Sequence, residues 1–324
     1  ETRSLSTATA ADPATYEGVL EEAKNAWMLE YGGSINKIPL IIHTDQHDTM
    51  GDDASKTMWE SIDKMVCWYD VSKVLNLGDT TNSYDNFDDP LLGDTALENY
   101  LEATKNIPFS KRIEVFGNHD CMKIINASLT YIQHSQGYLS PYFKNVMARK
   151  TSDNGYHVTY DSYFNVKYIV YSTYDYVDAS NYDLMSSAQY EFLIEEMSKN
   201  DGYDIVICGH QDSDVYREHL GALVKARYNK TAGTFTDRLG VSHTYDFTNC
   251  ENDLLVGLHG HSHSDGYNYP NDMLSQCFAN YYDSTRPIYF VIVDREIGQL
   301  KVWKVTKTPA ITTYTRPFVE PETT

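Results

Sequence analysis

The chain is poor in cysteine and in basic residues, and it has no long apolar run. Its 5 cysteines are widely spaced with no Cys-x-x-Cys pair, which argues against a disulfide framework and a zinc–cysteine site. No run of about 18 apolar residues occurs, so we expect no membrane span. Lys and Arg number 26 against 46 Asp and Glu, a formal net charge of −20. Non-specific affinity for duplex nucleic acid comes from basic contacts to phosphate, so duplex nucleic acid is not an expected partner.

The chain also lacks an initiator Met and an apolar leader, so we expect a processed product, a fragment, or part of a larger chain or assembly. We favour an extracellular, cell-surface or virion-associated location over a cytoplasmic one. Tyrosine is abundant, at 27 residues against 11 Phe. A ring with a polar tip suits surfaces that bind sugars or cell-envelope polymers, although Tyr also replaces Phe in half-exposed strands.

Short apolar runs alternate with helical patterns along the chain. Buried strands are predicted at residues 38–43, 74–77, 112–116, 204–208 and 254–258. Helices are predicted at residues 14–30, 54–69, 97–105 and 187–199. The second half adds a hairpin and three strands, at residues 156–161 with 164–173, and at 273–278, 288–293 and 300–305. Strand, polar loop and helix in repetition indicate an α/β protein with parallel strands.

These patterns also predict how the chain is divided. We expect an N-terminal lead and helix at residues 1–30, one principal domain at 31–305, and a Thr/Pro-rich tail or linker at 306–324. The principal domain is expected to have a two-sheet core covered by helices. Two long inserts, at 121–154 and 211–252, are expected to shape a pocket.

Polar clusters follow five of the predicted strands at the point where each strand ends. They are Asp45-Gln46-His47, Gly78-Asp79, Gly117-Asn118-His119-Asp120, Gly209-His210 and Gly260-His261-Ser262-His263. Ligands of open α/β sheets bind beyond the carboxyl ends of the strands. Alternate residues there can point at one ion, and the glycines allow close backbone approach. Carboxylate, imidazole and amide donors together suit Mn, Fe or Zn better than Ca, and one carboxylate can bridge two ions.

In this order the clusters resemble the pattern of the calcineurin-like metallophosphoesterases, over most of the chain. The resemblance implies two mixed β-sheets packed face to face as a sandwich and flanked by helices. It also implies two divalent metal ions, with Mn, Fe or Zn expected. Its implied ligands are Asp45, His47 and His263 for the first ion, Asn118, His210 and His261 for the second, and Asp79 as the bridge. His119 would be the proton donor to the leaving group, oriented by Asp120 or by Asp45.

The sequence departs from the protein-phosphatase branch of that family. No arginine follows Gly78-Asp79 closely, and the third cluster ends in Asp120 rather than Glu, so we do not expect a serine/threonine phosphatase. The stretch from His43 to His47 also resembles calcineurin-like modules of large phage-tail and bacterial surface proteins.

Three further residues lie close to the clusters. His43 is either a core histidine, a support for a metal ligand or a substrate contact. His259 has the strand alternation of His261 and His263, so it is a candidate for supporting a ligand or touching substrate. Asn82 follows Gly78-Asp79 and is a candidate for a place near the site.

We therefore expect a dinuclear-metal-dependent phosphoesterase, in which a metal-bridging hydroxide attacks a phosphate ester. The segments after the clusters are poor in Lys and Arg, which favours a phosphodiester over a monoester dianion. An envelope polymer or a small phosphodiester would be the substrate. The alternative is a non-catalytic metal-containing binding or structural module of a phage-tail or cell-surface assembly. A purely structural site would have no need of His119, which argues against that alternative.

Overall fold

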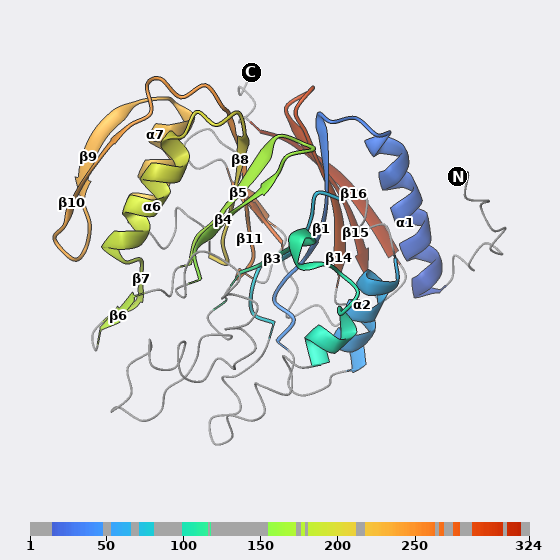
Figure 1. Ribbon diagram of the computed structural model, residues 1–324. Helices are drawn as coiled ribbons and strands as arrows, with labels where there is room; N and C mark the ends of the chain where they lie inside the picture. The colour runs from blue at the N-terminus through green and yellow to red at the C-terminus, as the bar shows by residue number, and fades with distance from the viewer. Residues whose placement is uncertain are drawn as a thin grey trace.

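The computed structural model describes residues 15–47, 53–65, 71–80, 99–115, 117, 155–172, 176–178, 181–211, 218–262, 266–268, 275–278, 287–306 and 310–318. The predicted site residues outside these ranges are Asn82, Asn118, His119, Asp120 and His263. The described residues form two large mixed sheets with helices on their outer sides, which confirms the predicted α/β sandwich (Figure 1).

The first sheet has the strand order β16-β15-β14-β1-β2-β3. Its strands are β1 (Lys37–His43), β2 (Lys73–Asn76), β3 (Arg112–Glu114), β14 (Ile288–Asp294), β15 (Gln299–Thr306) and β16 (Ala310–Pro317). β1, β2 and β3 run parallel, whereas β14 is antiparallel to β1. Both faces of β1 and β14 are covered, which is why each is an almost continuous apolar run. The three parallel strands place their carboxyl ends side by side.

The second sheet has the strand order β12-β13-β11-β8-β5-β4. Its strands are β4 (His157–Asp161), β5 (Val166–Val170), β8 (Asp204–Cys208), β11 (Leu254–His259), β12 (Gly266–Asn268) and β13 (Ser275–Cys277). β5, β8, β11 and β13 run parallel. The edge strands β4 and β12 pair antiparallel with their neighbours. In this sheet too, the carboxyl ends of several parallel strands lie next to one another.

The two sheets bury a shared core between them. Successive residues of a strand point to opposite faces of its sheet. Tyr168 and Val206 of the second sheet accordingly belong to the core that includes the first sheet, while Ile169 and Ile207 belong to a second cluster with the helices behind. The second sheet is therefore apolar on both faces.

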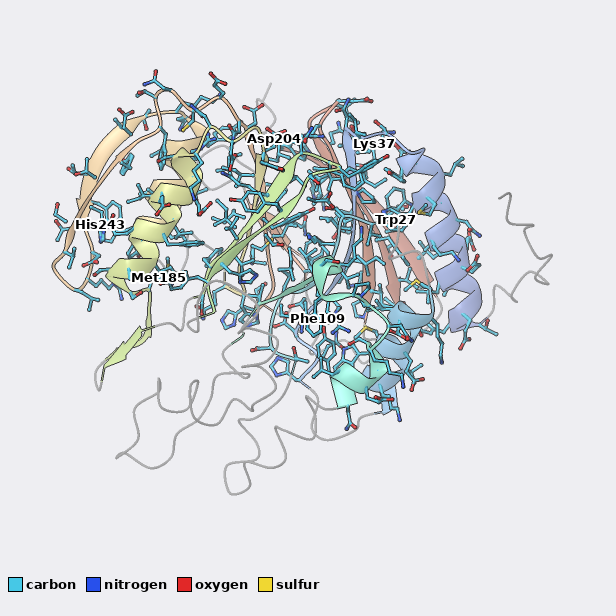
Figure 2. The ribbon with its side chains drawn as sticks, in the orientation of Figure 1. Trp27, Lys37, Phe109, Met185, Asp204 and His243 are labelled. Carbon is cyan, nitrogen blue, oxygen red and sulfur yellow. The ribbon has the colours of Figure 1, made fainter. Side chains whose placement is uncertain are left out.

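Helices cover the outer sides of the sandwich. α1 (Tyr16–Tyr31) and α2 (Asp53–Lys64) lie beside the first sheet, and α6 (Ser187–Ser198) and α7 (Glu218–Tyr228) beside the second (Figure 1). Trp27 of α1 is fully buried against the first sheet (Figure 2), where its Nε1 donates to the carbonyl of Val291 at 2.9 Å. Its ring centroid lies 5.2 Å from that of Phe290. None of the helices in the described ranges is long and apolar enough to cross a bilayer.

The remaining elements are short. They include the 3₁₀ helix η3 (Phe109–Lys111), the hairpin of β6 (Tyr176–Asp178) and β7 (Asn181–Leu184), and the hairpin of β9 (Ala232–Thr236) and β10 (Ser242–Asp246).

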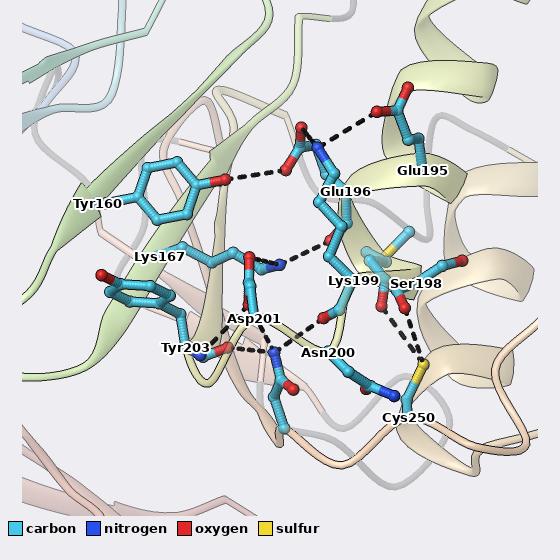
Figure 3. A network of polar contacts seen from close by, with 12 residues as sticks. Tyr160, Lys167, Glu195, Glu196, Ser198, Lys199, Asn200, Asp201, Tyr203 and Cys250 are labelled. Carbon is cyan, nitrogen blue, oxygen red and sulfur yellow. Dashed lines mark hydrogen bonds and ion pairs between the residues drawn. The ribbon is translucent and has the colours of Figure 1, made fainter.

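The C-terminal end of α6 is held by side chains from other elements (Figure 3). The last carbonyls of a helix have no partner within the helix. Lys167 of β5 donates to the carbonyl of Glu196 at 2.8 Å, and Arg227 of α7 donates to that of Met197 at 2.7 Å. Asn252 donates to the carbonyl of the residue after the helix at 3.0 Å. The two cationic donors also complement the negative end of the helix dipole.

Parts of this fold differ from the sequence prediction. The predicted tail at 306–324 contains β16, which pairs with β15 from Ala310 to Pro317. The described part of the 211–252 insert forms α7 and the β9–β10 hairpin, which pack against α6 on the outer side of the second sheet. β9 alternates between exposed and half-buried residues, so it lacks the apolar run from which a strand could be predicted. The division of the chain into three segments stays a prediction.

Candidate metal centre

Within each sheet, backbone hydrogen bonds join the loops that follow neighbouring strands. In the first sheet, the N–H groups of Asp45 and His47 donate to the carbonyls of Gly78 and Asp79, at 2.8 and 2.9 Å. The loops after β1 and β2 are therefore locked together. In the second sheet, the N–H of Gly260 donates to the carbonyl of residue 210 at 2.9 Å, which locks the loops after β8 and β11.

Two further contacts join the sheets to each other at this end. The N–H of His261 donates to both carboxylate oxygens of Asp45, at 3.1 Å each. The Nδ1 of His210 lies 2.7 Å from the carbonyl oxygen of Leu77. The candidate centre therefore lies where the carboxyl ends of both sheets meet.

Two groups of potential ligands share Asp79. One consists of Asp45, His47 and Asp79, the other of Asp79, His210 and His261, and within each group the ligand atoms lie within 4.8 Å of one another. The Oδ2 of Asp79 is 3.3 Å from Nε2 of His47 and 3.2 Å from Nε2 of His210. All of these residues are buried except His261, which is partly exposed. The Asp79 carboxylate thus lies between the groups, as a bridging ligand would.

His210 is oriented by the backbone of the opposite sheet. Because a carbonyl only accepts, the contact with Leu77 places a proton on Nδ1 and turns Nε2 toward Asp79. Ligating histidines are commonly fixed by such a contact. Burial lowers the pKa of His210, but the charge of Asp79 and the hydrogen bond to it outweigh burial and raise the pKa to about 9. A cation at Nε2 would have to displace a proton, so cation binding would compete with protons.

The donor chemistry of the centre fits divalent cations. Asp45 and Asp79 are 0% exposed, and burying carboxylates is unfavourable unless positive charge or a metal accompanies them. Imidazole nitrogens surround them on both sides. This mixture of oxygen and nitrogen donors suits Mn, Fe or Zn.

The ligands occupy an unusual backbone conformation. Asp45, His47, Asp79 and His261 have φ of 51°, 47°, 52° and 74°, in the left-handed region that residues other than glycine seldom adopt. Such residues cost about 1–3 kcal/mol each and persist only where the surroundings impose them. Here the interlocked loops impose them, and the result is that all four side chains are directed into one space.

Two glycines make room for this arrangement. Gly78 has φ 99°, and a Cβ on it would lie 2.6 Å from Nδ1 of His210. A Cβ on Gly117 would lie 2.0 Å from Oδ1 of Asp79. The glycines of the second and third sequence clusters are therefore required by the close approach of the ligands.

The structure also places the two other described candidates. His43 is 1% exposed, with its ring centroid 5.7 Å from that of Tyr100. Burial, and secondarily the charge of Arg112, lower its pKa to about 3, so His43 is neutral in the core. His259 ends β11, is 5% exposed and has Nδ1 3.2 Å from the carbonyl oxygen of Gly260.

Two polar residues that the sequence did not single out contact the centre's loops. Thr44 is buried and its hydroxyl donates to Oδ2 of Asp45 at 2.7 Å. Asn76 is buried at the end of β2 and bonds to the turn that carries Asp79. The only sequence signal was a polar residue close to a ligand: Thr44 directly precedes Asp45, and Asn76 lies in an apolar strand three residues before Asp79.

No protein-family model matches the chain, and no curated protein matches it. Solved structures do match. A dimetal phosphatase from Danio rerio is 10% identical, with a TM-score of 0.55 over 87% of this chain and 99% of that one. A purple acid phosphatase from yellow lupin (Lupinus luteus) seeds is 10% identical, with a TM-score of 0.53 over 86% of this chain and 53% of that one.

At this identity the likeness concerns the fold. Both matches extend over most of this chain. The fold expected from the five sequence clusters is confirmed: the chain has the calcineurin-like metallophosphoesterase fold.

Proposed function

We propose that the protein is a metal-dependent phosphoric ester hydrolase that holds two divalent cations in the two ligand groups. The observation that carries the proposal is the position of Asp79, which belongs to both groups at the meeting point of the sheets. The matching solved structures of a dimetal phosphatase and a purple acid phosphatase support it. Cations bound there would polarise phosphoryl oxygens and make water nucleophilic at neutral pH.

The chain's own residues would have distinct tasks. Asp45 and His47 would hold one cation, His210 and His261 the other, and Asp79 both. The hydrogen bonds between the loops keep these side chains in place before substrate arrives, which lowers the reorganisation needed for reaction. His119 lies outside the described residues and is proposed from the sequence as the proton donor to the leaving oxygen, a role worth roughly 10²–10⁴-fold in rate.

A phosphodiester is the substrate class that we favour. A monoester dianion would add more negative charge to a centre that already contains two buried carboxylates. Arg112, which lies close enough to lower the pKa of His43, is committed to Glu114 and to the carbonyl of Ile107. It therefore makes a poor partner for a second phosphate charge. Location outside the cell and membership of a phage-tail or surface assembly stay predictions from the sequence.

The experiment is hydrolysis of bis-p-nitrophenyl phosphate beside p-nitrophenyl phosphate. Metal-stripped protein is given Mn, Zn, Fe or Ni in turn. Asp79→Asn is the diagnostic variant because it keeps the side-chain shape and removes the charge. Asp204→Asn is the matched control. The Asp204 carboxylate belongs to neither ligand group, and it pairs with Arg295 at 2.9 Å.

We expect metal-dependent turnover, faster on the diester, that survives Asp204→Asn and is lost in Asp79→Asn. Faster turnover of the monoester would overturn the diester preference but would still support a metal-dependent hydrolase. Absence of turnover with every metal, in protein that binds two cations, would favour a non-catalytic metal-containing module instead.

A further inference from the structure

A buried amide spans the turn that carries Asp79. Asn76 is the last residue of β2 and is 1% exposed. Its Oδ1 accepts from the N–H of Gly78 at 3.3 Å, on one side of Asp79. Its Nδ2 donates to Oγ1 of Thr80 at 2.6 Å, on the other side. One side chain therefore holds both flanks of Asp79.

A charged group on the neighbouring strand β3 fixes the orientation of this amide. The Nδ2 of Asn76 also donates to Oε2 of Glu114 at 3.0 Å, and a carboxylate can only accept. Glu114, on β3, is itself buried and receives the Tyr100 hydroxyl at 2.9 Å on Oε1. Arg112 lies 3.7 Å from the same oxygen. Flipping the amide would set two oxygen atoms against each other, so only one orientation is stable.

This fixed amide bonds to a turn whose backbone lies in the left-handed region. Gly78 and Asp79 have φ of 99° and 52°, and Asp79 is the residue common to both ligand groups. We propose that Asn76 is a positioning residue, which, oriented by Glu114, holds the Asp79 carboxylate where it can serve two cations at once. This inference rests on the proposed function of the centre.

The test compares two variants that remove different supports. Asn76→Ala loosens Asp79 and should weaken both cation sites, by about 10- to 100-fold each if it behaves like other partners of metal ligands. Thr44→Val removes a hydroxyl that lies 2.7 Å from Oδ2 of Asp45 and 3.5 Å from the carbonyl of Gly78, so its main effect falls on Asp45, a member of one group only. It should weaken one site and spare the other. The readout is calorimetric titration of the stripped, full-length protein with Mn²⁺ alone, so it does not depend on activity.

A rescue variant separates positioning from general damage to the fold. In the double variant Asn76→Asp with Glu114→Gln, the hydrogen bonds can re-form with donor and acceptor exchanged, and the total charge is unchanged. Asn76→Asp alone sets two carboxylates against each other and should weaken binding at both sites, whereas Glu114→Gln alone keeps an acceptor oxygen for Nδ2 of Asn76 and should have a smaller effect. The pair together should recover most of the affinity for Mn²⁺. Ser72→Ala is the matched control, because it removes a buried hydroxyl that bonds to Tyr168 next to the opposite end of β2.

The outcomes are distinct. Loss at both sites in Asn76→Ala, loss at one in Thr44→Val and recovery in the double variant support the proposal. Unchanged Mn²⁺ affinity at both sites in Asn76→Ala, or equal losses of affinity in Ser72→Ala, would overturn the positioning role of Asn76. Neither result would contradict the proposed hydrolase function. A folded wild-type protein that binds no Mn²⁺ would instead refute the dinuclear centre, and the positioning role with it.

Discussion

At the residue scale, the candidate centre depends on a missing side chain as much as on those present. A Cβ at Gly117 would lie 2.0 Å from Oδ1 of Asp79 and 2.2 Å from its backbone nitrogen, so Gly117→Ala must displace the shared ligand. We expect Mn²⁺ binding to fall at both sites. The control is Gly233→Ala on β9, where the added Cβ meets the end of a Tyr245 side chain at 2.6 Å. Undiminished Mn²⁺ binding in Gly117→Ala would show that this contact relaxes without moving Asp79.

At the same scale, the sequence is most informative where chemistry and backbone restrict one position together. Asp45, His47, Asp79, His210 and His261 follow apolar strands, the resemblance carried by their order implies that they are ligands, and the structure brings them together. Asn76 and Thr44 are not predicted. Each acts through a hydrogen bond to a ligand or to its neighbours in the chain, and no residue pattern in a single sequence encodes such a bond.

At the scale of elements, α1 is attached to the first sheet by a shared carboxylate. Glu30 accepts from Lys37 of β1 at 3.0 Å and from Lys301 of β15 at 2.5 Å. The hydrogen bond from Lys301, followed by that from Lys37, lowers the pKa of Glu30 below its usual range. A lowered carboxyl pKa stabilises the fold above the unfolded pKa of about 4.3, and that stabilisation is lost as pH falls through the folded value.

Glu30→Gln should therefore destabilise the protein at pH 7 and have a smaller effect in acid. The Glu30 side chain is 31% exposed, so solvent screening limits the expected loss to about 0.5–1 kcal/mol. Urea unfolding of both proteins at a series of pH values measures it. A difference that stays constant from neutral pH to below about pH 4 would contradict the charge-based account.

A substitution at the buried C-terminal end of α6 should reduce stability more than Glu30→Gln does. Arg227 is 0% exposed and donates to the carbonyls of Met197 and Asn252, each at 2.7 Å. Arg227→Met leaves these buried acceptors without their donor, and we expect a loss of about 2–4 kcal/mol in the free energy of unfolding. Lys225→Met, on an exposed position of the same helix, is the control and should change little. Equal losses in the two variants would indicate an effect of helix composition instead.

Elements are predictable from sequence where burial covers both faces. β1, β8 and β11 read as apolar runs because both of their faces are covered. β16 consists of exposed and half-buried residues. Its threonines led to the prediction of a tail or linker, although their branched side chains suit a strand. The partner of each strand is not predictable, because an apolar run carries no information about which neighbour covers it.

At the scale of the whole molecule, the proposed cation held by Asp79, His210 and His261 would join the two sheets. Asp45 and His47 follow a strand of the first sheet, whereas His210 and His261 follow strands of the second. A cation that binds only the folded state stabilises it by about 2.7 kcal/mol at a concentration 100 times its dissociation constant. We expect stripped protein to melt at a lower temperature than protein with saturating Mn²⁺, as measured by calorimetry.

Asp79→Asn should abolish most of that metal-dependent shift, because it weakens both groups, whereas Asp204→Asn should preserve it. Melting curves that do not respond to Mn²⁺ in the wild type would mean that the sheets are not held together by cations.

The position of β1 has a consequence for how the chain is made. Its parallel neighbour β2 follows soon after it, but Lys37 pairs with Asp294 and Ile42 with Tyr289 on its other side. During synthesis, the second edge of the apolar strand from Ile38 to Ile42 therefore stays uncovered until β14, at residues 288–294, has been made. Unpaired apolar edges recruit other strands, and contacts between distant residues form slowly. Biosynthesis of this protein should consequently depend on chaperones that shield β1 until β14 leaves the ribosome.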